Sequence, residues 1–161
     1  MSEPGLSFRE LLDYTDAESR RWKEYFQKNP AAFELATDVR GAKNVRELVA
    51  HIFIAELIFG CAALGEPRPD LEQLPQSTVD EVFAIGEAAR KKMRDFIAQA
   101  GEKELAEQAP FGPAGQVSKR KMLGQALTHG MRHWAQLATD LRRAGYPTDW
   151  MHDWIMSPAV R

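Results

Sequence analysis

The sequence contains almost no cysteine, and its start lacks the features of a secretion signal. A single cysteine, Cys61, excludes an internal disulfide and therefore argues against a small disulfide-stapled secreted fold. The first ten residues contain neither a basic segment nor an apolar run, so they do not predict a signal peptide. The most apolar stretch, residues 48–64, is interrupted by His51 and Glu56, which favours a buried or interface helix over a membrane span. We therefore expect a cytoplasmic protein.

A strong charge of one sign is also missing. The net charge is -2 over 161 residues, and the basic residues form no dominant patch, which disfavours nucleic acid or an anionic membrane as the main partner. The sequence has no P-loop, no dinucleotide-binding glycine pattern, no HExxH and no GxSxG. No histidine follows a glutamate by three residues, so the di-iron bundle signature is absent. The length suits one domain over residues 1–161.

Local capping signals predict two helices in the first half of the chain. Ser7 and Glu10 have the spacing of a capping box, and Asn29-Pro30 ends the helix that follows. Asn44 is the expected cap of a second helix, which ends at Gly65. This second helix is apolar nearly all round, as expected of a central helix or of one that faces a second subunit.

Two further helices are predicted in the second half. The third is expected to be capped by Ser77 and to end near Gly101, with Arg90 on its solvent face. The fourth is expected to start at Ser118 and to end at Gly145. Apolar residues recur along the fourth helix in steps of three and four: Leu123, Leu127, Gly130, Trp134, Leu137 and Leu141.

These patterns predict an all-α four-helix bundle, because no convincing strand pattern accompanies the four long helices. The connections at residues 65–76 and 101–117 are long and rich in proline and glycine, so simple hairpin topology is not required. The C-terminal tail, residues 146–161, is expected to pack on the bundle because it carries several large apolar side chains: Trp150, Trp154, Ile155 and Met156.

Three histidines are the candidate metal ligands. His129 and His133 are four residues apart on the fourth helix, so their imidazoles share one face and can reach one ion. The alternative is a pair of solvated or helix-capping histidines. His51 lies in the most apolar helix, where a lone histidine is usually a core residue bonded to a backbone carbonyl. A third ligand reaching from a facing helix would leave coordination positions open for water or substrate.

Segments around these histidines resemble the DinB/YfiT-like family of metalloenzymes. The resemblance is carried by Val49-Ala50-His51-Ile52 with Glu56, by residues 128–137, and by residues 141–149. It implies a four-helix bundle with a three-histidine metal site, and it implies His51, His129 and His133 as the ligands. Members often have a doubled histidine followed by Arg-Gly-Gln, whereas here Arg132 precedes a single His133.

The resemblance also implies chemistry and assembly. Relatives have hydrolase-like or thiol-transfer activity, with low-molecular-weight thiols as substrates of some, and many are homodimers. We therefore expect a metal-dependent enzyme that holds one divalent ion (zinc, nickel, manganese or iron) and acts on a small molecule. The alternatives are a non-catalytic stress-response or interaction module with a structural or sensing metal, and a DNA-binding protein, which the charge disfavours.

Several other polar residues have simpler explanations. Gln136 is one turn beyond His133 and is a candidate for contact with the site through water, or an ordinary helix residue. Glu47 is explained by capping and Glu56 by an ion pair, whereas Asp140 is too far along the helix to share the ion. Other assignments are made from sequence position alone. His152 is assigned to the surface, unless the tail folds over the site and brings it near. Cys61 is assigned to the core, and Lys119, Arg120 and Lys121 to a solvated basic turn or an anion site.

Overall fold

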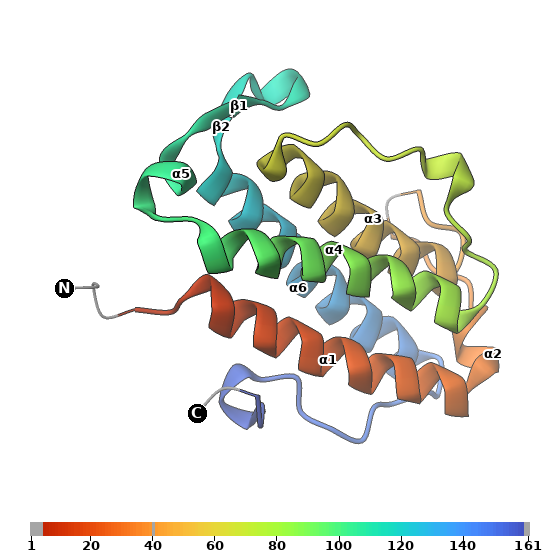
Figure 1. The fold of residues 1–161 in the computed structure, drawn as a ribbon. Coiled ribbons are helices and arrows are strands. Elements are labelled where there is room, and N and C mark those ends of the chain that lie inside the picture. The colour runs from red at the N-terminus through yellow and green to blue at the C-terminus, as the bar shows by residue number, and fades with distance from the viewer. Residues whose placement is uncertain (1–4, 40, 160–161) are drawn as a thin grey trace.

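Four long helices lie side by side in the computed structural model, which describes residues 5–39 and 41–159 (Figure 1). They are α1 (Phe8–Lys28), α3 (Val45–Leu64), α4 (Val79–Gln99) and α6 (Lys119–Arg143). Helix α3 packs against α4 and α6, and α1 packs against the same two helices. The fold is therefore mostly helical, with α3 in the most central position.

The helix ends follow the capping signals, with one correction. The Ser7 capping box, the Asn44 cap and the left-handed Gly65 at the end of α3 (φ 72°) are all present, as predicted. The prediction of Ser77 as the cap of α4 is wrong, because Thr78 is the cap and forms a capping box with Glu81. Thr78 lies three residues before Glu81, which is the separation that the box requires.

Short elements that the sequence did not predict occupy the connections. They are α2 (Pro30–Phe33), α5 (Glu102–Ala106), strands β1 (Gln108–Pro110) and β2 (Gln116–Ser118), and the 3-10 turns η1 (Leu71–Gln73), η2 (Gly112–Ala114) and η3 (Trp154–Met156). The two strands pair antiparallel, with Ala109 opposite Val117. Each strand has only three residues, which is too short for an alternating pattern to show in the sequence.

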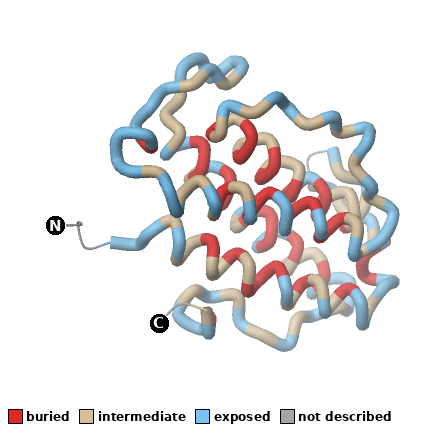
Figure 2. Tube along the Cα trace, viewed as in Figure 1, coloured by how far each residue is buried: buried red, intermediate tan, exposed pale blue. Residues whose placement is uncertain are grey.

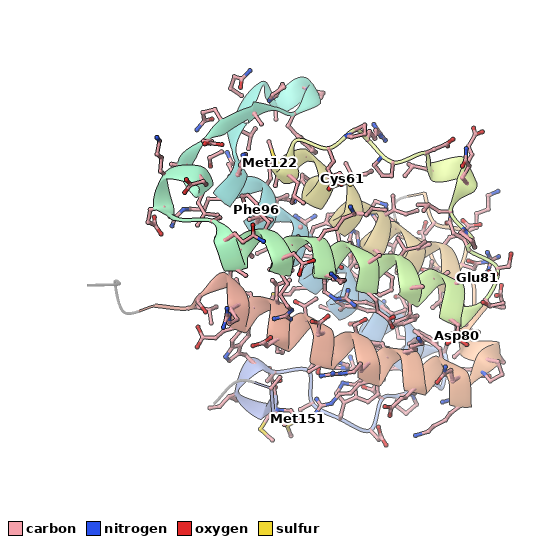
Figure 3. The ribbon with its side chains drawn as sticks, viewed as in Figure 1. Cys61, Asp80, Glu81, Phe96, Met122 and Met151 are labelled. Carbon is pink, nitrogen blue, oxygen red and sulfur yellow. The ribbon has the colours of Figure 1, made fainter. Side chains whose placement is uncertain are left out.

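The buried residues face the space between the four long helices (Figure 2). The whole predicted seam of α6 is buried, from Leu123 to Leu141, and Cys61 is a core residue as predicted. Helices α3 and α4 are in close contact at Gly86, where an added Cβ would lie 2.2 Å from Cδ1 of Phe53. Figure 3 shows Asp80 and Glu81 at one end of α4 and Phe96 at the other end, toward the paired strands β1 and β2.

The C-terminal tail runs along α1 (Figure 1), and Figure 3 shows Met151 below that helix. The hydroxyl of Tyr25 donates to the carbonyl of Tyr146 over 2.7 Å, and the ring of Trp154 stacks on Tyr14 at 4.8 Å. Trp150 packs against the core as expected. Two residues that were expected to pack do not, because Ile155 is 88% exposed and Met156 is 53% exposed.

Helix α3 is long and apolar enough to cross a membrane, judged by length and composition alone. However, 56% of its most apolar window is buried inside the fold, as expected of a core helix that packs on two neighbours. Burial between α4 and α6 therefore explains the apolar composition of α3 without a membrane.

Candidate metal centre

Three histidines from two helices converge on one point of the surface. His51 comes from α3, and His129 and His133 come from successive turns of α6. One ligand nitrogen from each ring lies within 4.8 Å of the others, and Nε2 of His129 is 3.2 Å from Nε2 of His133. The ring of His51 is 5.0 Å from that of His129 and 5.1 Å from that of His133, centroid to centroid. The structure thus brings together all three histidines that the sequence analysis selected.

The spacing of these nitrogens can be compared with that of a tetrahedral zinc site. Two nitrogens bonded to one zinc ion at about 2.0–2.1 Å are separated by about 3.3 Å at the tetrahedral angle. The 3.2 Å between His129 and His133 agrees with that separation. The 4.8 Å limit for the whole group is longer than that separation, so the three ligand atoms have to draw closer together for three bonds to form. His51 is the exposed member of the group.

Burial changes across the cluster. His51 is exposed, His129 is half-buried and His133 is buried. Burial, reinforced by the neighbouring His133, His51 and Arg132, lowers the pKa of His129 from 6.5 to about 4. The His129 imidazole is therefore neutral at pH 7, which is the protonation state that binds metal.

Gln136 orients the buried histidine. Nδ1 of His133 donates a hydrogen bond to Oε1 of Gln136 over 2.7 Å, from one turn further along α6. A proton on Nδ1 leaves the lone pair on Nε2, the nitrogen that faces His129. Outer hydrogen bonds of this kind set the tautomer and ring orientation of metal-binding histidines.

A groove with both apolar and polar walls continues from Gln136 along α6. Its volume is about 960 Å³, and its walls come from residues 36–39 and from the last turns of α6. Thr37 donates to the carboxylate of Asp140 over 3.0 Å, and Arg143 lies on the same wall. Its spacing along α6 places Asp140 too far from the histidines to share the ion, and its bond to Thr37 gives it a separate role. The segment at 36–39 carries no sequence motif and was not predicted as part of a site.

The assignment of His152 to an ordinary surface position is wrong. Its Nδ1 donates to Oε2 of Glu18 over 2.9 Å, and its ring stacks on Trp22 with the centroids 5.1 Å apart. Trp150 donates to the same Glu18 oxygen over 3.2 Å. Burial by itself raises the pKa of Glu18, but the hydrogen bonds from His152 and Trp150 outweigh it and lower the pKa overall. His152 therefore fastens the tail to α1.

The assignment of Arg90 to the solvent face of α4 is also wrong. Arg90 is only 2% exposed, and it donates to Glu56 of α3 over 2.7 Å and to Asp16 and Ser19 of α1 over 2.5 and 2.9 Å. The predicted ion pair of Glu56 thus exists, and Arg90 is its partner. Burial raises the pKa of Glu56 and Arg90 opposes that rise. One arginine ties three of the four long helices together.

The basic turn at the start of α6 is partly neutralised by nearby acids. Lys119 pairs with Glu107 over 2.7 Å, and Arg120 pairs with Glu102. Ser118 accepts a hydrogen bond from the backbone N–H of Lys121 as the helix cap. Glu47 likewise has a capping role, because its carboxylate accepts from the backbone N–H of Lys43 over 2.8 Å. These residues are therefore explained without a ligand.

A family model described as the DinB superfamily matches residues 7–137, a range that includes α1, α3, α4, most of α6 and all three histidines. The chain belongs to the DinB superfamily. The family resemblance inferred from the sequence is therefore confirmed, and it covers the region in which the histidines converge.

The DinB-like fold is also found in a solved structure of low sequence identity. A crystal structure of a DinB-like protein, YjoA from Bacillus subtilis, matches with a TM-score of 0.63 at 17% identity. The match covers 91% of this chain and 96% of that one. At this identity the likeness establishes the fold alone. No curated protein matches the chain by sequence.

Proposed function

We propose that this DinB superfamily member is a metal-dependent enzyme whose single divalent ion is held by His51, His129 and His133. The observation that carries the proposal is the convergence of three imidazoles from α3 and α6, with the two Nε2 atoms of α6 only 3.2 Å apart. Zinc, nickel, manganese and iron all accept imidazole ligands, so the donor set alone does not choose among them.

The residues present suit a divalent ion in two respects. His129 is held neutral by its surroundings, and His133 is held by Gln136 in the tautomer that presents Nε2 to the cluster. Three neutral ligands leave the full positive charge of the ion unbalanced, and three protein ligands leave coordination positions open. Such an ion lowers the pKa of a bound water or thiol and supplies a nucleophile near neutral pH.

We further propose a small-molecule substrate, with hydrolase-like or thiol-transfer chemistry. The exposed position of His51 supports access from solvent, and the groove beside Gln136 supports binding of a substrate near the ion. A low-molecular-weight thiol suits zinc in particular, because thiolate is a soft ligand. In this reading Gln136 has two tasks, since it orients His133 and also lines the groove.

The first experiment measures metal content by mass spectrometry on purified protein and on histidine variants. We expect about one equivalent in the wild type and a loss of most of it in His51→Ala, His129→Ala and His133→Ala. His152→Ala is the matched control, because it removes the fourth histidine, which lies outside the cluster. Metal-free wild type, or a metal content unchanged in all three variants, would falsify the site.

The second experiment tests catalysis. The protein is loaded separately with zinc, nickel, manganese or iron, and consumption of small thiols with electrophiles, and hydrolysis of simple esters and amides, are followed. We expect turnover that requires the ion and disappears in His133→Ala. If the ion binds but no metal supports turnover, the enzymatic part of the proposal is wrong and the metal site remains.

A structural or sensing role of the ion is the second candidate. The observation in its favour is that the ligands come from two helices, so that a bound ion would cross-link α3 to α6. Thermal denaturation of His133→Ala separates the two roles. A large drop in melting temperature with no effect of any substrate favours the structural role, whereas a preserved fold that has lost metal favours a site built for chemistry.

Assembly and location complete the proposal. We infer that residues 1–161 form one four-helix-bundle domain, cytoplasmic and homodimeric, without a nucleic-acid or membrane partner. Partly exposed Ile54, Ala55 and Ile58 share a face of α3 with His51, which supports this face as the dimer contact. Analytical ultracentrifugation tests it, because Ile58→Glu should convert a wild-type dimer to monomer. A monomeric wild type rules out the dimer and leaves the metal site unaffected.

A further inference from the structure

A cavity lies between α1, α6 and the C-terminal tail, and its lining includes none of the three histidines of the metal centre. Its volume is about 310 Å³, at the lower end of the range of small-molecule pockets. Met131 of α6 lines the cavity and is two residues from both His129 and His133. Two residues correspond to about 200° around a helix, so the cavity lies on the side of α6 away from the histidines.

The tail forms one wall of this cavity and is fastened to α1 by hydrogen bonds. The hydroxyl of Tyr14 donates to the backbone carbonyl of His152, and Nδ1 of His152 donates to Glu18 over 2.9 Å. Nε2 of His152 lies 3.0 Å from the hydroxyl oxygen of Thr148, so both ring nitrogens have partners. These bonds hold the cavity open in a defined shape between the tail and the two helices.

Most of the lining is apolar or aromatic. Met131, Trp134 and Ala135 of α6 form one wall, and the ring of Tyr14 comes from α1. Walls of this kind bind the apolar part of a ligand by removing it from water. The faces of tyrosine and tryptophan rings also attract a cation.

The cavity is lined by two carboxylates and, among the described residues, by no lysine or arginine. Glu18 is buried, and its bonds to Arg21 and to the tail occupy both of its oxygens. Asp153 is exposed, and within residues 5–39 and 41–159 its carboxylate has no hydrogen-bond or ion-pair partner. Burial, reinforced by the charges of Glu18 and Asp153, raises the pKa of the Tyr14 hydroxyl to about 12. Both carboxylates therefore act on the cavity wall.

These charges and apolar surfaces restrict the kind of ligand. An anion would be repelled by both carboxylates. A metal ion needs several oxygen or nitrogen ligands, and only Asp153 has oxygens that are not already bonded. An organic cation suits the site, because its charge pairs with Asp153 at the opening and its apolar part lies against the interior walls.

We propose that this cavity binds a small organic cation, with an ammonium group on an aromatic or aliphatic body. The ammonium group lies at Asp153, and the apolar body lies against Met131 and Trp134. This is a second small-molecule site, separate from the metal centre and independent of whether an ion is bound there.

An NMR titration of the purified protein compares three probes that share one phenyl ring. They are 2-phenylethylammonium, neutral 2-phenylethanol and anionic phenylacetate. We expect saturable binding of the ammonium compound, about fivefold tighter than the alcohol, because one exposed charge pair contributes that much at most. Phenylacetate should bind more weakly than either. The proposal is overturned if the ammonium compound does not saturate, or if the alcohol or phenylacetate binds as tightly.

The variant Asp153→Asn locates the site, because it removes the charge and keeps the size of the side chain. We expect its affinity for the ammonium compound to fall about fivefold, to that of the alcohol. Asp149→Asn is the matched control, since Asp149 is another exposed acid of the tail but lies outside this cavity, and it should bind like wild type. Equal affinities of Asp153→Asn and wild type contradict the proposal.

Two further variants separate the cavity from the metal centre. Ala135→Phe places a larger side chain on the cavity wall, so it should weaken binding of both the ammonium compound and the alcohol. His51→Ala alters the metal centre on the other side of α6 and should leave both affinities unchanged. Loss of binding in His51→Ala, with Ala135→Phe like wild type, would place the probe at the metal centre and overturn the proposal.

Discussion

Nδ1 of His133 donates to Oε1 of Gln136 over 2.7 Å, and this bond links the buried ligand of the histidine cluster to the groove along α6. The bond fixes which nitrogen of His133 carries the proton. With its proton on Nδ1, His133 presents the lone pair of Nε2 toward His129. An exposed glutamine thereby sets the chemistry of a buried imidazole.

Replacing Gln136 should therefore weaken metal binding without unfolding the protein. We expect Gln136→Ala to lower metal affinity by about 10- to 100-fold, the usual effect of removing such an outer hydrogen bond. Competition with a chromophoric chelator measures the change. Gln125→Ala is the control, because Gln125 is another exposed glutamine of α6, one turn before His129. Equal affinities in the two variants would show that Gln136 does not orient His133.

The depressed pKa of His129 predicts a pH dependence of stability. Its value is about 4 in the fold and 6.5 when unperturbed, so the unfolded chain binds the proton more readily in this interval. The stability that the neutral His129 contributes to the fold is complete above pH 6.5, and it is lost as the pH falls toward 4. The melting temperature of the metal-free protein should therefore decline from pH 6.5 downward, and more steeply than that of His129→Gln. Parallel curves for the two proteins would contradict the assignment.

Gly86 should be one of the least replaceable residues of the core. A Cβ at this position would lie 2.2 Å from Cδ1 of Phe53, which cannot move freely because it packs on Phe83 and Trp134. We expect Gly86→Ala to reduce the free energy of unfolding by about 1–3 kcal/mol, as overpacking does. Urea denaturation measures the loss, and Gly124→Ala, where no close contact arises, should show none. A Gly86→Ala protein as stable as wild type would mean that α3 and α4 can separate at little cost.

Removing one member of the buried Arg90–Glu56 pair should reduce the free energy of unfolding more than replacing both members with apolar residues. Arg90→Met leaves the fully buried carboxylate of Glu56 without its counter-charge, and we expect a loss of about 3–5 kcal/mol in the free energy of unfolding. The double variant Arg90→Met/Glu56→Leu should recover much of it, since Asp16 keeps Arg94 as a partner. A double-mutant cycle in urea measures the coupling. Additive losses would show that the two residues act independently.

The sequence by itself determined the features that depend on neighbours along the chain. Ser7 with Glu10, and Asn44 with Gly65, mark helix ends because a cap bonds to backbone groups only a few residues away. The shared face of His129 and His133 follows in the same way from the helical repeat. Even the error at Ser77 was local, since the three-residue spacing to Glu81 identifies Thr78.

Only the tertiary structure decided the relations between distant segments. His51 joins His129 because α3 packs on α6, and no spacing in the chain encodes that contact. The sequence predicts a solvent-facing Arg90, but the fold surrounds it with Glu56, Asp16 and Ser19. The physical reason is that burial of a charge depends on which partners other helices bring to it, whereas a cap or a helical repeat depends on hydrogen bonds within a single turn.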